Sequence, residues 1–168
     1  LVWSRLVHSY LMGERAPMSD LMAWNADATR MPARMHSEYL RRLFLQNDFS
    51  EGRFEVDGRP IALTDIRAPI FCVGTEHDHV APWRSVFKIQ LFSDADVTFV
   101  LASGGHNVGI VAPPSNPKAR YRILEKKEQA PYVDPDTWLE RAERRQGSWW
   151  GAWTDWLAAR SAGERVAP

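Results

Sequence analysis

Two short apolar runs, each followed by a polar loop, stand out in the hydrophobic pattern of the chain. They cover residues 70–73 and 97–101, and their β-branched and aromatic residues predict two buried strands. The loop after the first run contains Asp78 and leads to Pro82, a residue suited to the first turn of a helix. The loop after the second run is rich in glycine and contains His106. Loops at the carboxyl ends of neighbouring parallel strands meet in an open α/β sheet, so the pattern predicts that Asp78 and His106 lie close together.

The N-terminal part of the chain has the three-to-four spacing of amphipathic helices. Its clearest apolar face contains Tyr39, Leu43 and Phe44. We therefore expect residues 1–50 to form a helical cap or lid segment and residues 51–168 to form the sheet domain. A lid has to open for substrate, so the cap is expected to be more mobile than the sheet.

Weaker signals predict the remaining elements. Alternating apolar and polar residues around Asp57 and Gly58 predict a short hairpin within 54–63. The polar, basic stretch 118–127 predicts a surface loop, and Asp134, which precedes a proline, predicts the start of a helix. A helix is predicted between the loop that contains Asp78 and the second apolar run. It would face the sheet with the apolar side chains Trp83, Val86, Phe87 and Leu91.

Composition narrows the class of protein. The 168 residues are 45% hydrophobic, which suffices for one compact core, and the 21 basic and 21 acidic residues give no reason to expect a nucleic-acid partner. No apolar run reaches the roughly 20 residues of a membrane span, and the single cysteine suits a reducing compartment. We expect a cytoplasmic protein. Because the sequence begins at Leu1 inside a predicted helix, we also expect it to be the C-terminal piece of a longer protein.

Asp78 and His106 together have the chemistry of an acid–base pair. Histidine is the usual base near neutral pH, and a carboxylate on its other nitrogen fixes its tautomer and orientation. An aspartate in a loop is by itself more often a solvated residue, but a Gly-Gly-His loop one strand later favours catalysis. The order corresponds to the second half of a nucleophile–acid–histidine triad. The nucleophile itself is not found in this sequence.

Three other reactive side chains lie near Asp78. His77 and His79 flank it, but neighbouring loop residues rarely converge on one ion, so no metal is expected. His79 is a candidate substrate contact, or a hydrogen-bond donor behind the catalytic pair, whereas His77 is expected to be exposed. Cys72 lies inside the first predicted strand, where an inert thiol is the expectation and a nucleophile is not.

Four motifs carry a resemblance to a known family. The segment 78–83 (Asp-His-Val-Ala-Pro-Trp), together with His106 and the residues that follow it, resembles the C-terminal catalytic region of polyhydroxyalkanoate synthases, also called poly-β-hydroxybutyrate polymerases. The other three agree with the family in order and cover nearly the whole chain: Trp24-Asn25-Ala26-Asp27, Asp134-Pro135-Asp136-x-Trp138-Leu139 and Gly147-Ser148-Trp149-Trp150.

The resemblance implies the C-terminal part of an α/β-hydrolase fold with a helical cap. It also implies a cysteine-dependent acyltransferase that polymerises (R)-3-hydroxyacyl-coenzyme A into polyhydroxyalkanoate and releases coenzyme A, with Asp78 as catalytic acid and His106 as catalytic base. The partners would be the coenzyme A thioester and the growing polyester, and no cofactor is expected. A homodimer and an association with polymer granules are further expectations. Since the nucleophile elbow lies outside these residues, the chain alone should be inactive.

Two other functions fit the same residues. A serine-dependent α/β hydrolase, such as an esterase or polymer depolymerase, would show the same Asp78 and His106. A non-catalytic granule-binding module would instead use the C-terminal tryptophans. Trp149, Trp153 and Trp156 have helical spacing, which far more often means packing than a ligand platform.

Overall fold

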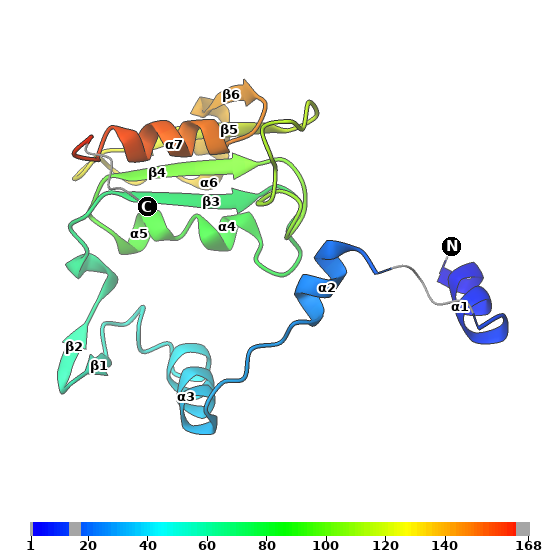
Figure 1. Ribbon diagram of the computed structural model, residues 1–168. Helices are drawn as coiled ribbons and strands as arrows, with labels where there is room; N and C mark the ends of the chain where they lie inside the picture. The colour runs from blue at the N-terminus through cyan, green and yellow to red at the C-terminus, as the bar shows by residue number, and fades with distance from the viewer. Residues whose placement is uncertain (1, 14–17, 164–168) are drawn as a thin grey trace. The chain divides into compact units, whose positions relative to one another are not determined.

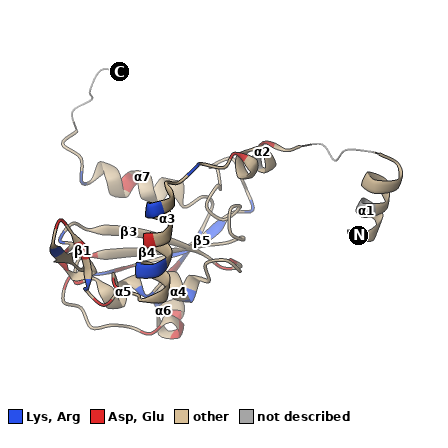
Figure 2. Cartoon of the chain, turned by 90° about the horizontal axis from the view of Figure 1, so that it is seen from below, with Lys and Arg blue, Asp and Glu red and all other residues tan. Residues whose placement is uncertain are grey.

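The computed structural model describes residues 2–13 and 18–163 (Figure 1). The chain divides into two compact units between Leu45 and Gln46. Figure 2 shows Lys and Arg interspersed with Asp and Glu in both units, in agreement with the equal numbers of basic and acidic residues. None of the described helices is long and apolar enough to cross a membrane.

The N-terminal unit is helical, as its amphipathic spacing predicts. Its elements are α1 (Val2–Leu11), α2 (Asp20–Ala26), α3 (Ala33–Glu38) and the π-helical turn η1 (Tyr39–Leu45). The Ser19 side chain caps α2 by accepting a hydrogen bond of 3.3 Å from the Met22 N–H. Tyr39 and Phe44 meet edge to face, with ring centroids 5.1 Å apart. The role of this unit as a cap remains a prediction.

The second unit begins with the predicted hairpin. Strands β1 (Phe54–Val56) and β2 (Arg59–Ile61) pair antiparallel, and the short 3-10 helix η2 (Leu63–Asp65) follows. Asp57 and Gly58 form the two-residue turn with φ angles of 50° and 74°. Positive φ at both positions is the requirement of the turn type that suits two-residue hairpins, so the Asp-Gly pair explains the hairpin.

A four-stranded mixed sheet forms the body of this unit. Its order is β3 (Ile70–Thr75), β4 (Val97–Ala102), β5 (Arg120–Lys126) and β6 (Glu143–Gln146). Strands β3 and β4 are parallel, and their last residues, Thr75 and Ala102, lie opposite each other. The predicted neighbouring parallel strands are therefore confirmed, and with them the α/β class. Strands β5 and β6 are antiparallel to their neighbours.

Helices cover both faces of the sheet (Figure 1). Helix α7 (Trp150–Ala158) lies on one face, and α4 (Trp83–Val86), α5 (Ile89–Phe92) and α6 (Pro135–Arg141) lie on the other. Trp149 packs over Val100 and Tyr121 on the first face, and Trp138 packs against Phe87 and Phe99 on the second. Strand β4 is buried over its whole length because it has a strand on each side and a helix on each face.

Two expectations about this unit are wrong. The stretch 118–127 is not a surface loop, because most of it is strand β5. Two of its long cationic side chains end on backbone carbonyls. Arg122 donates to the Leu139 carbonyl at 2.7 Å, and Lys126 Nζ donates to the Gln90 and Ser93 carbonyls at 3.1 and 3.0 Å. These contacts allow basic residues in a half-buried strand.

The helix after the first loop is also shorter than expected. It is interrupted between α4 and α5, so its predicted apolar face does not continue. Phe87 is fully buried, as expected, but Leu91 is 53% exposed and does not face the sheet. The sequence analysis did not predict strand β6.

Candidate active site

The loop that follows β3 wraps around the carboxylate of Asp78. Its Oδ1 accepts hydrogen bonds from the backbone N–H groups of Val80 and Ala81, both at 2.8 Å. Helix α4 begins two residues later, at Trp83. The side chain of Asp78 is 9% exposed, so its orientation is fixed by the loop rather than by solvent.

Asp78 and His106 are hydrogen-bonded to each other. Nδ1 of His106 lies 2.9 Å from Oδ2 and 3.1 Å from Oδ1 of Asp78. An ionised carboxylate can only accept, so Nδ1–H donates, and Nε2 keeps the lone pair that can take a proton. The convergence predicted from the two strand ends is confirmed. The His106 side chain is 46% exposed, which leaves room for a reacting group.

The surroundings keep Asp78 ionised. The pKa of Asp78 is lowered from 3.8 to about 2, and the hydrogen bond from the Ala81 N–H is the largest cause. Desolvation raises this pKa by less than the Ala81 bond lowers it, and the hydrogen bonds from His106 and Val80 lower it further. Asp78 therefore carries its negative charge throughout the neutral range. In that state it favours the protonated imidazole that forms whenever His106 takes up a proton.

Backbone contacts hold the two loops side by side. The N–H of Glu76 donates to the Ala102 carbonyl and that of His77 to the Gly104 carbonyl, both at 2.9 Å. These bonds continue the pairing of β3 with β4 beyond the ends of the strands. Residues 76–78 and the glycine-rich loop are therefore one connected structure.

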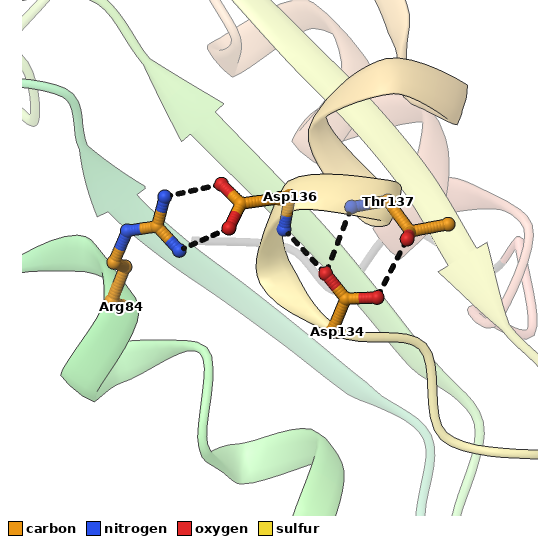
Figure 3. Close-up of polar contacts among 4 residues, drawn as sticks. All are labelled: Arg84, Asp134, Asp136 and Thr137. Atoms are coloured by element: carbon orange, nitrogen blue, oxygen red, sulfur yellow. Dashed lines mark hydrogen bonds and ion pairs between the residues drawn. The ribbon is translucent and has the colours of Figure 1, made fainter.

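Helix α4 is in turn linked to α6 (Figure 3). Both terminal nitrogens of Arg84 contact the carboxylate of Asp136. Asp134 caps the same helix by accepting from the N–H groups of Asp136 and Thr137, both at 3.0 Å, and from the Thr137 hydroxyl at 2.6 Å. The helix that follows the Asp78 loop is thus connected to the capped start of α6.

Comparison with known proteins identifies the relatives of this chain. No family model matches it. It is 41% identical over 157 residues to the poly(3-hydroxyalkanoate) polymerase subunit PhaC of Rhizobium meliloti (strain 1021), an alignment that covers 94% of this chain and 25% of the relative. It is 40% identical over 161 residues to poly(3-hydroxyalkanoate) polymerase 2 of Ectopseudomonas oleovorans, an alignment that covers 96% of this chain and 28% of the relative. The corresponding subunit of Cupriavidus necator is 34% identical over 169 residues, with 100% and 28% covered.

This chain is related to the poly(3-hydroxyalkanoate) polymerases. The resemblance predicted from the four motifs is confirmed by sequence identity over nearly all of the chain. The chain spans about a quarter of the length of these relatives.

The remaining predicted residues are His77 and His79, which flank Asp78 in the chain, and Cys72 in β3. His77 and His79 are exposed, and in the described part of the chain neither imidazole forms a hydrogen bond. Among the described residues, no group of three or more His, Cys, Asp or Glu is placed to hold a metal ion. Burial raises the pKa of the Cys72 thiol to about 11, as expected for an inert cysteine within a strand. A role for His79 at the site remains a prediction.

Sequence reasoning missed a basic hollow beside this site. Nη2 of Arg120 lies 3.6 Å from Oε2 of Glu76. Glu76 is two residues before Asp78 in the chain. A cavity of about 360 Å³ opens there, and its charged lining includes Arg122 and Arg144. Arg120 and Arg122 come from β5, which was expected to be a loop, and Arg144 comes from β6, which was not predicted, so their proximity depends on the pairing of β5 with β6.

Proposed function

We propose that this chain supplies the acid and the base of an acyltransferase that polymerises (R)-3-hydroxyacyl-coenzyme A into polyhydroxyalkanoate. One observation carries the proposal: Nδ1 of His106 lies 2.9 Å from the Asp78 carboxylate in a chain related to poly(3-hydroxyalkanoate) polymerases. Asp78 orients His106, and Nε2 of His106 is the base.

The fold we propose is the C-terminal part of an α/β hydrolase, with residues 1–50 as its helical cap. Parallel strands β3 and β4, the helices between them, and an acid followed by a histidine at the two strand ends support this assignment. In that fold the nucleophile lies on a turn earlier in the chain than the acid. Cys72 is inside β3 and its raised pKa disfavours the thiolate, so the proposed nucleophile is a cysteine outside these residues.

The proposed reaction uses His106 twice in each transfer. Nε2 takes the proton of the cysteine thiol, and the thiolate attacks the thioester carbonyl. The bond from that carbonyl to the coenzyme A sulfur breaks, and His106 returns the proton to the departing thiolate. His106 next takes the proton of a 3-hydroxyl group, whose oxygen attacks the carbonyl carbon of the acyl-cysteine. The bond from that carbon to the cysteine sulfur breaks, His106 returns the proton to the cysteine thiolate, and the polyester is longer by one ester bond. Asp78 stays ionised throughout.

The basic hollow supports a polyanionic substrate. Its charged lining consists of one acidic residue, Glu76, and four arginines, Arg120, Arg122, Arg144 and Arg145. Coenzyme A carries phosphate groups far from its thioester, and guanidinium groups bind phosphate well. The phosphates of coenzyme A would therefore suit this hollow while the thioester lies at His106.

Each of the two other functions has less support. A serine-dependent hydrolase would use the same pair, but the relatives are named as polymerases. A granule-binding module would need several exposed tryptophans. Trp149 is buried and Trp156 packs against Phe71 with ring centroids 5.6 Å apart, which leaves Trp153, 42% exposed, as the exposed one of the three. Cytoplasmic location, a homodimer and contact with polymer granules belong to the proposal as properties expected of a polymerase.

Activity is tested in a chimera, the Rhizobium meliloti polymerase in which this chain replaces the matching quarter. Release of coenzyme A from 3-hydroxybutyryl-coenzyme A is measured. His106→Ala should lower kcat by about 10²–10⁴-fold, the usual contribution of a general base. Cys72→Ala should keep most of the activity. A folded His106→Ala chimera that turns over like its parent would overturn the proposal.

A further inference from the structure

The Ser-Trp-Trp sequence at the start of α7 holds the turn that follows His106, residues 107–112. Three consecutive side chains donate hydrogen bonds to three carbonyls of this turn. The bonds run from Ser148 Oγ to the Ala112 carbonyl at 2.5 Å, from Trp149 Nε1 to the Gly109 carbonyl at 3.1 Å, and from Trp150 Nε1 to the Ile110 carbonyl at 3.0 Å. We call these three side chains the clamp.

The clamp is itself fixed to the sheet. Trp149 is 8% exposed, and its ring stacks on Phe71 of β3 at 6.2 Å between centroids and 28° between planes. The Ser148 hydroxyl also accepts from the Trp150 N–H at 3.1 Å, which starts α7. The clamp therefore transfers the rigidity of β3 and α7 to the turn after His106.

Apart from the clamp, the turn is held by its own backbone hydrogen bonds and by the buried residues Gly109 and Ala112. Val108 and Val111 within it are 61% and 57% exposed, so burial of their side chains does not fix the turn. The clamp adds hydrogen bonds that join the carbonyls of Gly109, Ile110 and Ala112 to the start of α7. His106, only three residues before Gly109, would move with the turn if these bonds were lost.

We infer that Ser148, Trp149 and Trp150 are positioning residues that keep Nδ1 of His106 on the Asp78 carboxylate. The buried indole N–H of Trp149 needs an acceptor, and both it and the indole N–H of Trp150 find theirs on the turn after His106 rather than on their own helix. The effect on catalysis rests on the proposed function, but the effect on the geometry of His106 does not.

The first experiment uses the chain itself and does not depend on activity. Nitrogen-15 NMR of the imidazole reports the His106 Nδ1 proton hydrogen-bonded to Asp78. Trp150→Phe and Ser148→Ala keep most of the packing and remove one donor each, and the Nδ1 proton should then exchange about fivefold faster with water. Trp153→Phe is the matched control, because Trp153 is 42% exposed on the same helix. If both folded variants show the parent's rate of exchange of the Nδ1 proton with water, the inference is overturned.

The second experiment measures kinetics in the chimera. Loss of one clamp donor should lower kcat about fivefold with little change in KM, because the base is misplaced while the binding surface remains. Ser148→Thr, which keeps the hydroxyl, should restore kcat, and Trp153→Phe should match the parent. Equal loss of kcat in Ser148→Thr and Ser148→Ala would assign Ser148 to packing and overturn its positioning role. If the parent chimera and its His106→Ala variant are equally inactive, the proposed function fails. The NMR result alone then decides whether the clamp positions His106.

Discussion

Gly109 lies so close to Thr75 that a Cβ atom at position 109 would overlap Cγ2 of the threonine. Thr75 is the last residue of β3 and is 1% exposed, so it has little room to move. Its hydroxyl lies 3.5 Å from Oδ2 of Asp78. One buried side chain therefore contacts both halves of the site, the carboxylate of Asp78 and the turn that follows His106.

This contact predicts that Gly109→Ala displaces the turn. The added methyl group has to push against buried Thr75, and overpacking of this kind costs about 1–3 kcal/mol of unfolding free energy. In the chimera, kcat should fall because His106 moves with the turn. Urea unfolding of the chain and release of coenzyme A by the chimera measure the two effects.

Gly151 is the matched control for that substitution. It lies in α7, and a Cβ atom there would meet nothing within 4 Å. Alanine is a better helix former than glycine, so Gly151→Ala should stabilise the chain by up to about 1 kcal/mol and leave kcat unchanged. Equal effects of the two substitutions would show that Gly109 is not held against Thr75.

A second prediction concerns acid stability. The pKa of Asp78 is about 2 in the folded chain, against an ordinary value of 3.8. Between these two pH values the unfolded chain binds a proton at this position and the folded chain does not, so stability from Asp78 is complete above about pH 4 and is lost as the pH falls toward 2. The difference in unfolding free energy between the parent and Asp78→Asn should therefore shrink over that window. Parallel pH curves for the two proteins would contradict the lowered pKa.

The sequence was sufficient to predict that Asp78 and His106 meet because its signals are local. The apolar runs 70–73 and 97–101 lie in β3 and β4, two neighbouring strands of the sheet, and each strand is followed directly by the loop that contains Asp78 or His106. Parallel pairing of two such strands is enough to bring Asp78 to His106. The Asp-Gly hairpin and the capped helix α6 were predictable for the same reason.

The rest depends on partners far away in the sequence. Strand β5 looked like a loop because its basic residues are acceptable in a strand only where the carbonyls of α5 and α6 receive them. The clamp looked like plain packing because the acceptor of the Trp149 indole lies 40 positions earlier, at Gly109. Spacing within a helix reveals a face, but it does not reveal which carbonyl lies opposite that face.

A third prediction separates packing from charge in the anchoring of α4 to α6. Trp138 is 1% exposed among Phe87 and Phe99, so Trp138→Ala should cost about 3–5 kcal/mol of unfolding free energy. Its indole N–H is buried and, among the described residues, lacks an acceptor, so Trp138→Phe should cost much less.

The charge test uses Arg84→Gln, which removes the ion pair with Asp136 in Figure 3. Both side chains of this pair are exposed, so the loss of unfolding free energy should be smaller than for Trp138→Ala and should fade at high salt. Thermal unfolding of the four proteins gives the order, and an Arg84→Gln loss as large as that of Trp138→Ala would contradict it.

The last prediction concerns the basic hollow and its arginines. Arg144 lines the cavity of about 360 Å³ near Glu76 and would meet a phosphate of coenzyme A rather than the reacting thioester. An interaction made equally in the bound substrate and in the transition state changes KM and not kcat. Arg144→Gln in the chimera should therefore raise KM about two- to fivefold, the size expected of one solvent-exposed ion pair, and added salt should reduce the difference. Arg59→Gln, an equal loss of charge on the exposed hairpin strand β2, is the matched control and should leave KM unchanged. The same rise in KM for both variants would mean a general effect of net charge, and a fall in kcat for Arg144→Gln would mean that the hollow acts on the catalytic loops instead of on the substrate.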